Sequence, residues 1–141
     1  MGRARLIAEV LELQGVLARR TLGQQADLLE DAHLTVAQLR TMLVVHASAP
    51  IPTAEAARRV GLRPNVATGV VARLVDRGWI RRESDPADGR VRLLALTAEG
   101  EAFVARVVSA VEREQESQLR RLDAAQLEQL RGILEALASD A

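Results

Sequence analysis

The chain has 141 residues, of which 48% are hydrophobic and 27% are charged, a balance typical of a single folded domain rather than a disordered chain. It contains no cysteine, which excludes disulfide bonds, thiolate zinc sites and thiol-based redox sensing. It also has no apolar run long enough to cross a membrane and no start resembling a signal peptide, so we expect a cytoplasmic protein without membrane contact.

The charges are unevenly distributed, although the formal net charge is zero. Residues 58–92 contain nine arginines and four acidic residues, so this segment carries +5 and the rest of the chain −5. A basic centre between acidic ends indicates a segment that binds a polyanion. All nineteen basic residues are arginines. This side chain suits phosphates and guanine edges, but genome composition is the simpler explanation of so complete a bias.

The first third of the chain predicts two helices. Leucine, isoleucine and valine recur at steps of three and four residues from Arg5 onwards, which predicts a helix that could extend to about residue 29 unless one of its glycines interrupts it. Thr35 followed by Gln38 forms a capping box, in which each side chain accepts a hydrogen bond from a free backbone amide at the helix start. The second helix is therefore expected at residues 36–46.

Two shorter helices follow, separated by a tight turn. Pro52 and Thr53 open the first, which Gly61 ends, and Pro64 opens the second, which Gly78 ends. The apolar residues of the second helix predict an inward-facing stripe: Val66, Val70, Val71, Leu74 and Val75.

A hairpin and two further helices complete the chain. The segments WIRRES (79–84) and VRLLAL (91–96) have the character of strands, and DPADG joins them as a turn. Thr97 caps a long helix, whose predicted apolar stripe contains Phe103, Val104, Val107, Val108, Val111, Leu119 and Leu122. Asp123 starts a last helix with leucines at 127, 130, 134 and 137.

This order of elements predicts a mostly α fold with a small β-hairpin wing, a winged helix-turn-helix inside a helical dimerisation frame. We expect a single domain over residues 1–141. Within it, residues 35–98 would form the winged DNA-binding lobe, and residues 1–34 and 99–141 the helical dimerisation lobe.

The helix that starts at Pro64 is the candidate DNA-reading element, because the glycine-containing turn presents its N-terminal residues to a major groove. Asn suits adenine, Arg suits guanine, and Thr suits a base edge or a phosphate. The outward positions are Arg63, Asn65, Thr68, Gly69, Ala72 and Arg73. A plain helical hairpin with a solvated outer face is the alternative.

Gly69 is unusual, because a glycine inside a helix costs about 1 kcal/mol relative to alanine. Two explanations fit the sequence equally well. The glycine could allow the helix to approach DNA closely, or it could allow close packing against the helix in front of it.

Arg90 follows a turn that would project beside the DNA-reading helix, where it could enter a minor groove. Asp88, two residues earlier, could bind the guanidinium and fix its direction. The alternative is a surface salt bridge worth less than about 1 kcal/mol. Further arginines on the same hairpin, Arg81, Arg82 and Arg92, favour the DNA contact.

The segment from about Leu34 to Gly100 resembles the MarR family of bacterial transcriptional regulators. The most specific similarity is D-x-R before LT-x-x-G, matched by Asp88, Arg90, Leu96, Thr97 and Gly100, and the R-G-hydrophobic-hydrophobic step is matched by Arg77, Gly78, Trp79 and Ile80. The resemblance implies a homodimeric winged-helix regulator, most commonly a repressor, that binds double-stranded DNA at a palindromic operator and often has its DNA affinity lowered by a small-molecule effector.

The resemblance also implies site residues. It places the DNA contacts at Arg63, Asn65, Val66, Thr68 and Arg73 on the helix from Pro64 to Arg77, and at Arg90 on the wing. Two departures from the family pattern stand out. Arg63 occupies a position that is commonly a helix-capping serine, and Gly69 a position that is usually larger and polar, so no operator sequence can be carried over from relatives.

Leucines at 127, 130, 134 and 137 form a seam that fits another helix, either within the chain or in a second copy. An effector would lie near the first, second and long helices, where His33, His46 and Arg40 are the only polar candidates. Ordinary structural roles suit these three residues better, so the ligand-binding residues are unknown. Trp79 is expected in the core beneath the wing.

No catalytic, metal-binding or phosphate-loop spacing is present, so we expect no enzyme activity, no cofactor and no metal site. The remaining alternative is a winged-helix module that docks onto proteins without binding DNA. Such a module would not need Arg63, Arg73, Arg90 and their neighbours on one face.

Overall fold

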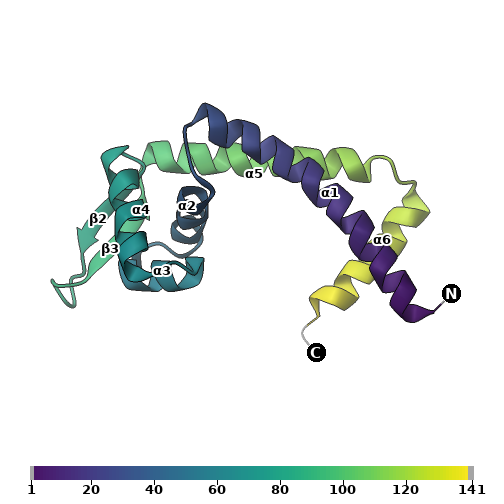
Figure 1. The fold of residues 1–141 in the computed structure, drawn as a ribbon, viewed down its shortest axis with the longest axis horizontal. Helices are drawn as coiled ribbons and strands as arrows, with labels where there is room; N and C mark the ends of the chain where they lie inside the picture. Colours follow the sequence, from purple (N-terminus) through teal and green to yellow (C-terminus); the bar gives the residue numbers. More distant parts are fainter. Residues whose placement is uncertain (1, 140–141) are drawn as a thin grey trace. The chain divides into compact units, whose positions relative to one another are not determined.

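The computed structural model describes residues 2–139 and consists of helices with one small sheet (Figure 1). The elements are α1 (Arg3–Asp31), α2 (Val36–Ser48), β1 (Ile51–Pro52), α3 (Thr53–Val60), α4 (Pro64–Asp76), β2 (Ile80–Ser84), β3 (Arg92–Leu96), α5 (Ala98–Leu119) and α6 (Ala124–Ala138). They form two compact units, one from residues 25–108 and the other from residues 1–24 and 109–141. None of the described helices is both long and apolar enough to span a membrane.

Local sequence determines most of the helix ends. Thr35 and Gln38 form the predicted capping box at the start of α2, and Asp123 forms another with Gln126 at the start of α6. Gly61 ends α3 in the left-handed conformation, with φ of 79°, a region that glycine enters without a steric penalty. The mostly α fold with a small wing is confirmed.

The sheet contains one strand that the sequence did not reveal. β3 lies between β1 and β2, and both pairings are antiparallel. β1 has only two residues, Ile51 and Pro52, which pair with Leu94 and Leu93. The β2–β3 hairpin projects beyond the helices of its unit, as expected for a wing (Figure 1).

The core of the unit formed by residues 25–108 draws on α2, α3, α4, the sheet and the first half of α5. Fully buried members include Met42, Val45, Leu74, Leu94 and Val104. The compact unit is wider than the expected lobe of residues 35–98, because buried side chains of α5 such as Val104 pack into this core.

The predicted inward stripe of α4 is wrong at one position. Ala67, Val71 and Leu74 are buried, whereas Val66 is 46% exposed. Residues 67, 71 and 74 follow the helical repeat, and residue 66 lies one position, about 100° of rotation, away from them. Val66 therefore belongs to the outer face of α4.

Trp79 lies beneath the wing, as predicted, where its ring stacks on Phe103 with centroids 4.7 Å apart. The Cζ atom of the Arg77 guanidinium lies 4.3 Å from the centroid of the Trp79 ring. The guanidinium also donates hydrogen bonds to the carbonyl oxygens of Ala32 (2.6 Å) and His33 (3.0 Å). Arg77 thus joins the end of α4 to the turn that follows α1.

The base of the wing is closed by Thr97. Its backbone N–H donates to the carbonyl of Trp79, and its hydroxyl donates to the carbonyl of Gly78 and accepts from the N–H of Gly100. A side chain at Gly100 would overlap the Trp79 carbonyl oxygen and would place its Cβ 3.1 Å from the carbonyl carbon. The first turn of α5 therefore packs directly on the backbone at the start of β2.

The second unit has few buried side chains. α1 is continuous through both of its internal glycines, and neither α1 nor α6 buries any residue. The predicted inward position Leu119 of α5 is 41% exposed, and Val108, the last residue of the other unit, is 38% exposed. Among the leucines of α6, Leu134 is 54% and Leu137 73% exposed. A single chain therefore leaves much of its apolar surface in this unit in contact with water.

Candidate nucleic-acid interface

The helix-turn-helix is built from α3, the turn at Gly61 and α4. Arg63 occupies the N-cap position of α4 in an extended conformation, and its side chain makes no capping hydrogen bond. The residue is exposed, and its guanidinium has no acceptor for an amide hydrogen bond at the helix start. Pro64 follows at the first helical position.

The outer face of α4 carries every helix residue predicted to contact DNA. The exposed members are Arg63, Pro64, Asn65, Val66, Thr68, Gly69 and Arg73. The hydroxyl of Thr68 donates to the carbonyl oxygen of Pro64 at 2.9 Å, so its donor is already used within the helix.

The structure distinguishes between the two explanations for Gly69, close approach to DNA and close packing against another helix. A Cβ added there would meet no atom within 4 Å. Close packing against another helix is therefore wrong as the reason for this glycine, and it marks an open position on the outer face.

The wing arginines lie on two different faces of the sheet, because successive side chains of a strand point to opposite sides. Arg92 lies opposite Ser84 in the hairpin and donates to its hydroxyl at 2.8 Å. Arg82, two residues before Ser84, points to the same side of the sheet. Arg81 points to the other side, where it forms a salt bridge with Glu83.

The wing tip is fixed by its own backbone. Asp85 and Val91 pair at the end of the hairpin, and Asp85 also caps the N–H of Ala87. Asp88 accepts from the backbone N–H of Arg90 at 3.0 Å. The expectation that Asp88 binds the Arg90 guanidinium is wrong, because the short side chain meets the nearer backbone amide two residues on. The guanidinium of Arg90 is exposed.

Two hollows lie where the wing meets the helix-turn-helix; α3 and the wing line both, and α4 lines one of them. One, of about 220 Å³, is lined by Thr53, Thr68, Val71, Arg82 and Arg92. The other, of about 370 Å³, is lined by Pro52, Thr53, Ala54, Arg90, Val91 and Arg92. Arg82, one of the hairpin arginines that the sequence singled out, lines the first hollow. Thr53 lines both hollows and was not among the predicted contacts, because only the fold of α3 brings it to the wing.

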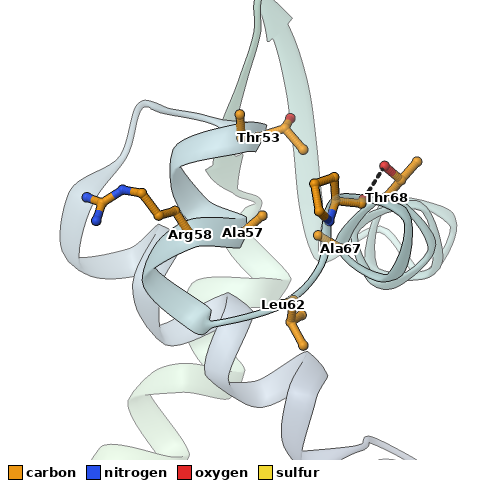
Figure 2. A pocket seen from close by; sticks show the side chains of 8 residues that line it. Thr53, Ala57, Arg58, Leu62, Ala67 and Thr68 are labelled. Atoms are coloured by element: carbon orange, nitrogen blue, oxygen red, sulfur yellow. Dashed lines mark hydrogen bonds between the residues drawn. The ribbon is translucent and has the colours of Figure 1, made fainter.

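A third hollow, of about 480 Å³, lies between α3 and α4 (Figure 2). Its lining is mainly apolar and includes Ala57, Leu62 and Ala67. Figure 2 shows the Arg58 side chain directed away from the other labelled residues. This guanidinium pairs with Glu55 instead, so the hollow has no charged group directed into it.

The arginines of α3 differ from those of α4 and the wing, because they form ion pairs with a carboxylate. Hydrogen bonds from Arg58 and then Arg59 lower the pKa of Glu55 from 4.5 to about 2. Within residues 2–139, by contrast, no carboxylate lies within 4.0 Å of Arg63, Arg73, Arg82, Arg90 or Arg92. The positive charge of α4 and the wing is therefore available to an external anion.

Two of the three polar residues weighed as effector contacts have side-chain partners within the unit. Arg40 is exposed and donates to the carbonyl of Val60 at 2.9 Å. His46 lies 2.8 Å from a carboxylate oxygen of Glu101. In the described part of the chain, no three histidine, aspartate or glutamate side chains are grouped to hold a metal ion.

Comparison with known proteins identifies relatives with the same architecture. A model of the MarR family matches residues 34–91. The HTH-type transcriptional repressor Rv2887 of Mycobacterium tuberculosis is 30% identical over 107 residues, which cover 76% of this chain and 77% of that protein.

Solved structures extend the likeness over nearly the whole chain. RV1404 from M. tuberculosis is 25% identical, with a TM-score of 0.83 and coverage of 97% of this chain and 92% of that one. A mutant of MepR from S. aureus, bound to an oligodeoxyribonucleotide, has a TM-score of 0.72 at 18% identity, with coverage of 91% and 94%. The family model and the relative that is 30% identical together show that this chain belongs to the MarR family of transcriptional regulators.

Proposed function

We propose that the chain binds double-stranded DNA sequence-specifically as a homodimer and acts as a transcriptional repressor. In this proposal α4 enters the major groove, and Arg90 at the wing tip enters the adjacent minor groove. Asp88 holds the turn, and Arg92 with Arg82 meets the phosphates between them. The same geometry would serve an activator if the operator lay at a different place relative to the promoter.

The observation that carries the proposal is a set of arginines that have no carboxylate partner within residues 2–139. Arg63 lies at the start of α4 and Arg73 near its end, and the wing supplies Arg82, Arg90 and Arg92 around the hollows that α3 shares with it. Arginines at the two ends of an exposed helix and on the neighbouring wing fit the phosphate strands that border a groove.

The homodimer is supported by the apolar surface of α1 and α6. Leu6, Ile7, Val10 and Leu11 of α1 are between 45% and 61% exposed. Leu119, Leu130 and Leu134 also line a hollow of about 540 Å³, together with residues of α1 and α5. Monomeric proteins rarely leave so much contiguous apolar surface exposed, and a second copy would bury it.

A homodimer implies the form of the operator. Two recognition helices related by a two-fold axis would lie about one DNA turn, roughly 34 Å, apart and would read a palindrome. A small-molecule effector would act by binding one spacing of these helices better than the other.

Selection of bound duplexes from a random DNA library, at moderate salt, tests the proposal directly. Enrichment of a palindrome with half-sites about one turn apart is the expected result. The affinity should also fall steeply as salt is raised, because arginine contacts release counterions from DNA.

The alternative is the protein-docking module without DNA binding. If a folded dimer enriched no DNA sequence, and if its affinity for DNA did not depend on salt, the results would favour that alternative and would contradict the proposal.

A further inference from the structure

We propose that Val66 and Gly69, at the centre of the exposed face of α4, recognise the 5-methyl group of a thymine. This inference rests on the proposed function, because it concerns the DNA that α4 would read.

The first observation is the position of Val66. Its side chain is 46% exposed, while the core contacts of α4 are made by Ala67, Val71 and Leu74. An exposed valine contributes little to the fold, and its neighbour Asn65 is polar. A surface that binds only phosphates would not need an apolar side chain here.

The second observation is the open position beside it. Gly69 follows Val66 by three residues, so the two share one side of the helix. A Cβ at Gly69 would meet nothing within 4 Å, and a glycine in mid-helix weakens the helix. Neither packing nor helix stability explains the glycine, whereas a group that enters the gap next to Val66 does.

The third observation concerns the polar groups nearby. The Thr68 hydroxyl donates to the Pro64 carbonyl, so it is not a free donor for a base. Asn65 lies one turn before Gly69 and Arg73 one turn after it. The reading face therefore has polar groups at its two ends and an apolar gap between them.

The chemistry of the major groove identifies the ligand. Each base pair presents hydrogen-bond donors and acceptors at its edge, and only thymine adds an apolar methyl group. The unpaired arginines of α4 and the wing bring this face to DNA by charge. The apolar gap then favours a thymine beside the base pair that Asn65 would read.

Deoxyuridine substitution tests the inference, because it removes the methyl group and retains the base pairing and the O4 acceptor. In the selected operator, each symmetry-related pair of thymines is replaced in turn, and binding is measured by fluorescence anisotropy at fixed salt. At one pair, the wild-type chain is expected to lose about fourfold in affinity per half-site, about fifteenfold for both, which corresponds to one buried methyl group each.

Variants connect the effect to the residues. Val66→Ala should bind the thymine operator several-fold more weakly and should no longer distinguish thymine from deoxyuridine at that pair. Gly69→Ala should fill the gap and reduce the same discrimination. Val36→Ala is the matched control, because Val36 is an exposed valine (63%) of α2 outside the reading helix; it should keep the wild-type ratio.

Two results would overturn the inference while leaving the proposed function intact: specific binding with no methyl-sensitive thymine, or a Val66→Ala variant that keeps the wild-type sensitivity. Absence of any sequence-specific binding would overturn both. The circular dichroism of each variant shows whether its helices are retained.

Discussion

Replacing Gly100 by alanine should destabilise the protein, because α5 packs on the backbone at the start of β2. The new Cβ would overlap the carbonyl oxygen of Trp79 and would lie 3.4 Å from the Cβ of Leu96. Relief of the overlap requires a shift of about 1 Å. The Trp79 oxygen cannot move freely, since it accepts the N–H of Thr97.

The magnitude follows from two opposing effects. Overpacking costs about 1–3 kcal/mol, and weakening the Thr97 hydrogen bond costs about 1 kcal/mol more. Alanine recovers up to about 1 kcal/mol of helix propensity. The free energy of unfolding should therefore fall by about 1–3 kcal/mol.

Urea denaturation at a fixed protein concentration measures this difference, with fluorescence of the single tryptophan, Trp79, as the probe. Gly69→Ala is the matched control, because its Cβ would enter open space. That variant should be about 0.5–1 kcal/mol more stable than wild type. The packing argument would be refuted if Gly100→Ala were as stable as wild type or shifted in the same direction as Gly69→Ala.

Three further predictions concern arginines and a carboxylate. Arg90→Ala should reduce operator affinity about tenfold and flatten the salt dependence without changing the unfolding free energy; an unchanged affinity in anisotropy titrations would remove the wing contact. Arg77→Ala should lower the unfolding free energy by about 1–2 kcal/mol, since the carbonyls of Ala32 and His33 lose their donor and the Trp79 ring its cation; equal stability in urea would contradict this role. The lowered pKa of Glu55 means that its ion pairs stabilise the fold above pH 4.5 and lose this effect as the pH falls towards 2. At low salt, Glu55→Gln should thus be less stable than wild type at pH 6 and equal to it near pH 2, and a difference independent of pH would refute the assignment.

The helix boundaries could be predicted because they depend on neighbouring residues. The capping boxes of α2 and α6 and the left-handed glycine after α3 are each contained within four residues of sequence. The hairpin is likewise predicted from its turn and the two short strand-like segments that flank it. Such features require no knowledge of what packs against them.

Features that depend on distant partners could not be predicted. Arg77 binds carbonyls 44 and 45 residues earlier in the chain, and two-residue β1 forms only because β3 lies beside it. The apolar pattern alone predicts Val66 in the buried stripe, whereas the family resemblance places it among the contacts on the outer face, because several neighbouring valines of α4 allow more than one apolar stripe. The core, rather than the local pattern, selects which stripe is buried.

Because Thr97 closes the base of the wing, the β2–β3 hairpin can change in length at its tip. Thr97 binds the chain at Gly78 and Trp79, while the tip holds itself together through Asp85, Asp88 and Val91. Residues inserted at the tip would lengthen a loop whose ends stay fixed, and each doubling of a flexible loop costs only about 0.6 kcal/mol. The hairpin can therefore gain or lose residues, or be exchanged for a hairpin of different reach, while α4 and α5 keep their places.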